Sequence, residues 1–349
     1  MLKGLSLTPP VVGRISIGRV VERNGKRLPE KDDEFTITTQ IQSKDGWVLH
    51  PVNETMRKAQ STGLISSANA KLRCIPVRLL FNDPDLNLRA NYSLFDRQTG
   101  RPLCVGNGDT CRRSTVNGIQ TMPCPAPEGC DLAEKGCKPL GRLNVRIDEG
   151  EAGSDELSGF VFRTTGFNSI RTLATRLNYF HAVSGGHLTT MPLELRLRGK
   201  STTKSHRAPI FYVDLTVRTG MDLNEAIKQA KAEAAQRDAA GFDQAALDKA
   251  AREGLQHGAF EETAEEGVAV VEEFFPDAKP RRARAGHEVD PRDCIAISDA
   301  PPSLAEKLNK VMAMFDARIE ANQRNGVAAT TVTQPNGAHP PNKTQEAVP

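Results

Sequence analysis

The chain has 349 residues and a net charge of +3, and 38% of its residues are hydrophobic, below the roughly 45–50% of a typical globular domain. Seven Cys residues are too few for a disulfide scaffold, and no apolar run approaches the roughly 20 residues of a membrane span, so both classes are excluded. The opening MLKGLSLTPP has no apolar core of a signal peptide, which predicts a cytoplasmic protein with reduced cysteines.

Residues 1–218 are predicted to form one β-rich domain, because runs of β-branched and aromatic residues alternate there with turn signals. The predicted strands are 11–21, 35–41, 74–81, 88–96, 143–147, 159–165, 193–199 and 208–217. One strong helix is expected at 168–183, where apolar residues recur at helical spacing before Gly185. The pattern predicts an α+β fold with a mostly antiparallel sheet and one main helix.

The chain changes character after residue 218. Residues 219–276 are acidic and Ala-rich, and Asp222 with Glu225 forms a capping-box pattern that opens a helix. We expect a Pro- and Arg-rich linker at 277–302, an amphipathic helix at 303–325 and a disordered tail at 326–349. The apolar stripe of the amphipathic helix is Leu304, Leu308, Val311, Phe315 and Ile319. That stripe could dock on a partner protein or a second copy, or pack on the β-rich domain.

Charge is distributed unevenly along the chain. Residues 1–220 carry 31 Lys and Arg against 21 Asp and Glu, a net charge of +10, whereas residues 221–276 carry 5 against 13, a net charge of −8. A basic domain with an acidic appendage suggests that the basic part faces a polyanion. The candidate phosphate contacts are Arg14, Arg19, Arg23, Lys26, Arg27, Arg112, Arg113, Arg196, Arg198 and Lys200. If these side chains share one face, they form a surface that tracks a nucleic-acid backbone.

A cluster of cysteines lies within the segment 104–137. Its five members are Cys104, Cys111, Cys124, Cys130 and Cys137. The segment is rich in Gly and Pro and has little apolar material, so we expect a loop that needs a structural staple. Thiolates bind Zn²⁺ tetrahedrally, and the energy of binding becomes folding energy. The absence of His from the segment favours one structural zinc over a catalytic one, with five candidates for four places.

Several segments together resemble a known family. They are GRISIGRVVERNGKRLPEKDDEFTIT near the N-terminus, LCVGNGD followed by CRR, then PCP and GCKPLGRLNVRI, then TTGFNSIRTL and MPLELRLR. In this combination the chain is similar to the recombination directionality factor-like proteins of phages and integrative elements. The resemblance covers about residues 11–218 and does not extend to 219–349.

The resemblance implies a function that works through a partner. Founding members of the family bind a large serine integrase, a recombinase of mobile elements, and switch it from integration to excision without chemistry of their own. The resemblance also favours Cys104, Cys124, Cys130 and Cys137 as the zinc ligands. Cys111 stands where the family is expected to have a small residue. This departure from the family leaves Cys111 as an alternative ligand to Cys104.

Two other functions remain open from the sequence. The basic charge of residues 1–220 allows a nucleic-acid-binding protein of phage or plasmid DNA metabolism. A metal-dependent phosphoesterase would need Asp83, Asp85 and Asp109 to hold a divalent cation, although Asp83-Pro84-Asp85 is also ordinary turn chemistry. No phosphate-binding loop of the GxxxxGK type and no GxSxG motif occurs in the sequence. The sequence does not indicate an oligomeric state.

Overall fold

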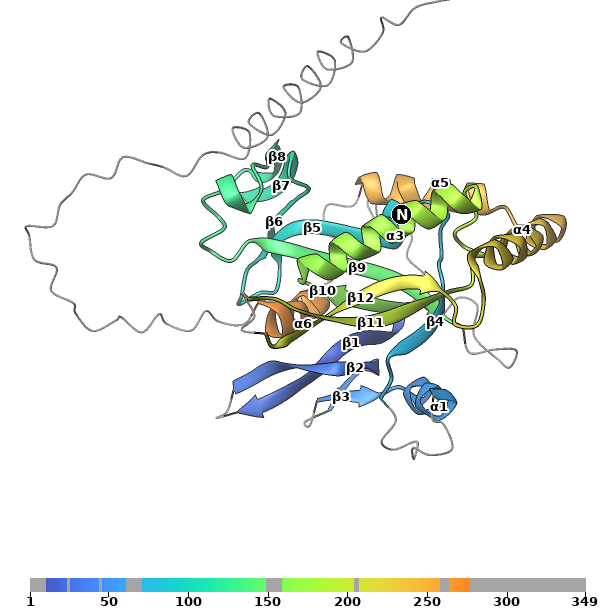
Figure 1. The fold of residues 1–349 in the computed structure, drawn as a ribbon. Helices are drawn as coiled ribbons and strands as arrows, with labels where there is room; N and C mark the ends of the chain where they lie inside the picture. Colours follow the sequence, from blue (N-terminus) through green and yellow to red (C-terminus); the bar gives the residue numbers. More distant parts are fainter. Residues whose placement is uncertain are drawn as a thin grey trace, which may run out of the picture. The chain divides into compact units, whose positions relative to one another are not determined.

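The computed structural model describes residues 11–23, 26–43, 46–60, 71–148, 159–203, 207–257 and 264–275 (Figure 1). The chain divides into two compact units, Met1–Lys279 and Pro280–Pro349, and every described residue belongs to the first. The predictions for 277–302, 303–325 and 326–349, including the stripe from Leu304 to Ile319, lie outside the described residues.

The described residues build one twelve-stranded sheet. Its strands are β1 (Val11–Arg23), β2 (Lys26–Ser43), β3 (Gly46–Leu49), β4 (Cys74–Arg78), β5 (Leu88–Phe95), β6 (Pro102–Gly106), β7 (Thr110–Thr115), β8 (Gly118–Pro123), β9 (Lys138–Ile147), β10 (Gly159–Thr164), β11 (Leu193–Ser201) and β12 (Pro209–Val217). The main order is β3-β2-β1-β10-β9-β5-β6-β7-β8, and β4 joins the end of β9 to the pair β11 and β12. All pairs are antiparallel except β1 with β10. The prediction of a mostly antiparallel α+β fold is therefore confirmed.

The main helix, α3 (Phe167–Ser184), packs against the sheet as its periodicity predicts. Leu173 and Leu177 are fully buried in the core beside sheet residues such as Phe162. The helix ends at Gly185, whose φ of 72° is the left-handed conformation that a residue with a side chain adopts at a cost.

Two further helices are short and carry weaker signals. Helix α1 (Pro51–Gln60) lies between β3 and β4, and the Gln60 side chain bonds the backbone of Arg73 and Cys74. Helix α2 (Pro84–Asn87) begins in the predicted turn at Asp83, whose carboxylate accepts from the Asp85 N–H at 2.9 Å.

The acidic segment forms three helices in the same compact unit as the sheet. They are α4 (Leu223–Ala239), α5 (Gln244–His257) and α6 (Ala264–Phe274). Asp222 caps α4 as predicted, because its carboxylate accepts from the Glu225 N–H at 2.8 Å. Ala226 and Ala230 of α4 are buried in the main core. The predicted boundary at residue 218 falls where the strands end and the helices begin, and both parts lie in the compact unit Met1–Lys279.

The remaining packing of the helices divides between two small clusters. Ala251 of α5 contacts Phe81 and Leu86, and residues from α6 pack on Phe95 and Leu140. None of the helices that the structure describes is long and apolar enough to cross a membrane.

Candidate functional site

The first part of the cysteine segment extends the sheet, and the part from Cys124 to Cys137 forms turns, as expected of a loop. Strands β6, β7 and β8 add to β5 as an antiparallel meander, with Cys104 on β6 and Cys111 on β7. Asn107 stabilises the turn between β6 and β7, because its side-chain oxygen accepts from the N–H groups of Asp109 and Thr110 at 2.8 Å. Backbone hydrogen bonds to an existing sheet edge thus order a segment that has few apolar residues.

Three of the thiols form a buried cluster. Cys104, Cys111 and Cys124 are at most 9% exposed and pack with Leu94, and Cys137 packs against them. Gly106 makes this packing possible, because a β-carbon added there would lie 2.7 Å from the Cys111 Cβ and from the Cys124 Sγ. The meander therefore leaves a space beside Gly106 that the two cysteines fill.

Burial and neighbouring thiols raise the pKa of two of the cysteines. Burial raises the pKa of Cys111 to about 11, and Cys104 beside it adds to this effect. Burial likewise raises the pKa of Cys137 to about 11, with contributions from Cys104, Cys130 and Cys124. The five thiols predicted from the sequence thus occupy one neighbourhood.

Arg113 is the charged residue of this cluster. A hydrogen bond to Cys104 raises the pKa of Arg113, and the Arg113 Nη2 lies 4.0 Å from the Cys130 Sγ. A guanidinium in that position stabilises negative charge on sulfur. The sequence pattern suggested phosphate contact for Arg113 and missed this role, since the meeting of β7 with Cys130 depends on tertiary structure.

The thiols are not arranged around a common point as the ligands of a bound metal would be. Within the part of the chain that the structure describes, no three Cys, His, Asp or Glu side chains form a group that could hold a metal ion. The choice between Cys104 and Cys111 as ligand stays open, because both are buried in the same cluster.

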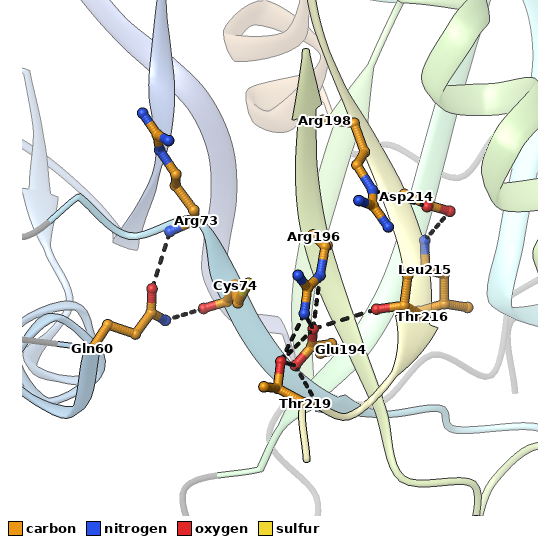
Figure 2. A network of polar contacts seen from close by, with 10 residues as sticks. All are labelled: Gln60, Arg73, Cys74, Glu194, Arg196, Arg198, Asp214, Leu215, Thr216 and Thr219. Carbon is orange, nitrogen blue, oxygen red and sulfur yellow. Dashed lines mark hydrogen bonds and ion pairs between the residues drawn. The ribbon is translucent and has the colours of Figure 1, made fainter. Parts of the chain in front are cut away.

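The predicted basic residues of β11 lie over two buried carboxylates (Figure 2). Arg196 pairs with Glu194, and the Arg198 Nε lies 3.3 Å from an Asp214 oxygen. Lys200 donates to the Asn168 side chain at 2.7 Å. The carboxylates of Glu194 and Asp214 thus offset the positive charges of Arg196 and Arg198.

Glu194 is the centre of that network. Burial alone would raise the pKa of Glu194, but the Thr219 N–H, the Arg196 guanidinium and the Thr219 hydroxyl hold it below its ordinary value. Because Glu194 remains a carboxylate, Arg196 is held to the sheet and links β11 to the segment after β12.

Of the five N-terminal basic residues, the structure describes the side chain of Arg14. Arg14 is 6% exposed, pairs with Glu273 of α6 and lies 4.1 Å from the centre of the Trp47 ring. The side chains of the other four members lie outside what the structure describes, namely Arg19, Arg23, Lys26 and Arg27. Arg112 is half-buried on β7 beside Arg113.

Of the aspartates considered for a phosphoesterase, Asp83 has a structural role. Asp83 caps α2 and pairs with Arg252 of α5 at 2.6 Å. Asp109 is exposed in the turn between β6 and β7, and these carboxylates join no metal-binding group among the described residues.

One set of charged residues was missed by the sequence reasoning. Arg163 of β10 lies opposite Arg142 of β9, which lies opposite Arg89 of β5. Residues opposite one another in a sheet share a face, so three guanidinium groups stand in a row on neighbouring strands. Only the strand register reveals this row, since the three residues are far apart in the sequence.

Comparison with known proteins gives one match. A family model described as Gp3-like, recombination directionality factor-like, matches residues 12–218, which is more than half of the chain. The match contains the whole sheet except its first residue, the cysteine segment and α1 to α3, and it stops before α4. No curated protein and no solved structure matches the chain.

Proposed function

The chain belongs to the Gp3-like, recombination directionality factor-like family, and we propose that it binds the serine integrase of a mobile element and favours excision. The observation that carries the proposal is the family match over residues 12–218, which takes in both the sheet and the cysteine segment.

The proposed mechanism is differential binding. A protein that binds one conformation of a recombinase more tightly than another shifts the equilibrium by the difference between the two binding free energies. A tenfold difference in affinity for the two conformations corresponds to about 1.4 kcal/mol. Moving the ratio of the two conformations from 1:99 to 99:1 takes a difference of about 10⁴-fold, or about 5.5 kcal/mol. This mechanism requires no reacting group of the factor itself, and Asp83 has a structural role in capping α2 and pairing with Arg252.

We also propose that the cysteine segment binds one structural zinc through Cys104, Cys124, Cys130 and Cys137, with Cys111 as the alternative ligand. Three observations support this proposal: thiolates are preferred zinc ligands, three of the thiols are buried together, and Gly106 leaves room for them. Arg113 beside Cys104 and Cys130 would offset the negative charge of a zinc–thiolate group. Bound zinc would supply a cross-link between the β6–β8 meander and the turns that follow it.

The recombination assay tests the main proposal. The protein is added to the integrase of its element, and attL × attR and attB × attP recombination are measured beside integrase alone. We expect excision to rise and integration to fall, together with a complex in size-exclusion chromatography. Unchanged direction in both assays without a complex would exclude the proposed function.

Metal analysis tests the zinc proposal separately. Protein purified without added metal is compared with Cys104→Ser and Cys111→Ser by mass spectrometry. About one zinc per chain, lost in only one of the two variants, would identify the ligand. A wild-type protein without zinc would contradict the proposal and leave the recombination function to be judged on its own assay.

A further inference from the structure

Four neighbouring strands place arginines on one face of the sheet. Arg163, Arg142 and Arg89 are directly opposite one another on β10, β9 and β5. Arg14 of β1 is paired with Val161, which lies two residues from Arg163 and therefore on the same face. Since strands are spaced about 4.8 Å apart, the row is roughly 14 Å long.

Three of the four arginines are buried, and Arg163 is half-buried. Arg14, Arg142 and Arg89 are 6%, 6% and 5% exposed. Like charges directly opposite one another destabilise a sheet, and buried charges need partners. Each of the four arginines interacts with another group, so the row is a stable concentration of positive charge on one face of the sheet.

Helix α6 covers this face. Val270, Val271 and Phe275 pack on Phe95 and Leu140, which belong to the same face of β5 and β9. Glu273 pairs with Arg14, so the helix brings negative charge to the row. Lys138 of β9 bonds the carbonyl of Phe274, and α6 is preceded by a stretch from 258 to 263 that lies outside the described residues.

The apolar contact that holds α6 is small. Its cluster contains Phe95 and Leu140 from the sheet and three buried residues from the α6 segment, whereas α3 packs into the main core through residues that include Leu173 and Leu177. Elements with few buried contacts open at lower free energy than the core. A competing ligand should therefore displace helix α6 more easily than α3.

The chemistry of α6 indicates what that ligand is. The helix offers the Glu273 carboxylate to Arg14 and an apolar surface to Phe95 and Leu140. A single strand of nucleic acid offers the same pair of features, because its phosphates are anionic and its bases have flat apolar faces that stack on aromatic rings. Trp47, which lies beside Arg14, provides such a ring at one end of the row.

We infer that the face formed by Arg14, Arg163, Arg142 and Arg89 binds the phosphate backbone of single-stranded nucleic acid and that acidic helix α6 occludes it. This inference does not depend on integrase binding. An acidic helix from a protein partner is the competing occupant, and the test separates the two.

The test uses the full chain with α6 weakened. Val271→Asp places a charge in the buried contact, and Glu273→Lys reverses the charge beside Arg14. Val268→Asp is the matched control, because Val268 lies on the same helix with 41% of its surface exposed. Hydrogen exchange of residues 264–275 reports whether α6 has been displaced.

Binding is measured by fluorescence anisotropy with a labelled oligothymidylate and with a labelled duplex. We expect the two weakening variants to bind the oligothymidylate at least about tenfold more tightly than wild type or Val268→Asp, a change of about 1.4 kcal/mol. Adding Arg142→Gln should reverse the gain and lower the salt slope by about 1. Arg171→Gln, on the exposed side of α3, should leave both unchanged.

Three results would overturn the inference. The first is no gain in binding when hydrogen exchange shows that α6 is displaced. The second is a gain that survives Arg142→Gln. The third is no increase in exchange at α6 in either variant or in wild type with excess oligothymidylate, because a helix that nothing displaces occludes no site. Binding of a synthetic peptide of residues 264–275 without binding of the oligothymidylate would assign the face to an acidic protein helix instead.

Discussion

Gly106 and Cys124 approach each other so closely that a β-carbon on Gly106 would lie 2.7 Å from the Cys124 Sγ. The same β-carbon would lie 2.7 Å from the Cys111 Cβ and 3.1 Å from the Thr110 carbonyl oxygen. Contacts below 3.0 Å force a shift of one partner, and here the partners belong to the strand meander and the buried thiol cluster. Glycine at position 106 is therefore a packing requirement of the cysteine cluster.

Replacing Gly106 should open this cluster. Gly106→Ala is expected to lower the free energy of unfolding by about 1–3 kcal/mol, the usual effect of overpacking, and to increase the reaction of the thiols with a disulfide reagent. Gly129→Ala is the matched control in the same segment, because its nearest contact would be 3.3 Å, to the Pro125 Cβ. Equal effects of the two substitutions would show that Gly106 has no special place in the packing.

Arg113 should affect the retention of zinc through the charge it brings to the sulfurs. Arg113→Met removes the hydrogen bond to Cys104, and loss of such a supporting contact typically lowers metal affinity about 10- to 100-fold. The measurement is transfer of zinc to a colorimetric chelator. Arg112→Met on the same strand is the control and should release zinc at the wild-type rate. Identical release from wild type and Arg113→Met would remove Arg113 from the site.

Local features of the fold were predictable from the sequence, whereas features that depend on strand register were not. The helix at 168–183 and the Asp222 cap arise from spacing within one turn or a few turns, and both occur in the structure. A loop was predicted for the whole cysteine segment, and turns do occur at 124–137. The few apolar residues of the segment did not reveal that β6, β7 and β8 add to the sheet beside β5. The alignment of Arg163 with Arg142 likewise depends on strand pairing, which no local pattern encodes.

The acidic helices should contribute to the stability of the whole unit. Ala230 of α4 is fully buried in the main core, so Ala230→Leu is expected to lower the free energy of unfolding by about 1–3 kcal/mol through overpacking. Ala232→Leu, on the exposed side of the same helix, should change it by less than about 0.5 kcal/mol. Denaturant unfolding checks both, and a single transition that moves only for Ala230→Leu would show that α4 unfolds with the sheet.

Asp148 should make the stability of the protein depend on acidic pH. Burial alone would raise the pKa of Asp148, but hydrogen bonds from Arg218 at 2.5 Å and Arg78 at 3.0 Å lower it from 3.8 to about 2. A lowered carboxylate pKa stabilises the folded state above the ordinary value, and this stabilisation is lost as pH falls from about 4 to about 2. Its size is about 2 kcal/mol.

Asp148→Asn should therefore destabilise the protein by about 2 kcal/mol near neutral pH and flatten the fall in stability between pH 4 and pH 2. The measurement is denaturant unfolding at a series of acidic pH values. Asp131→Asn removes an exposed carboxylate and is the matched control. If the wild type and Asp148→Asn lost stability in parallel over that range, the ion pairs of Asp148 with Arg78 and Arg218 would not be the source of the acid sensitivity.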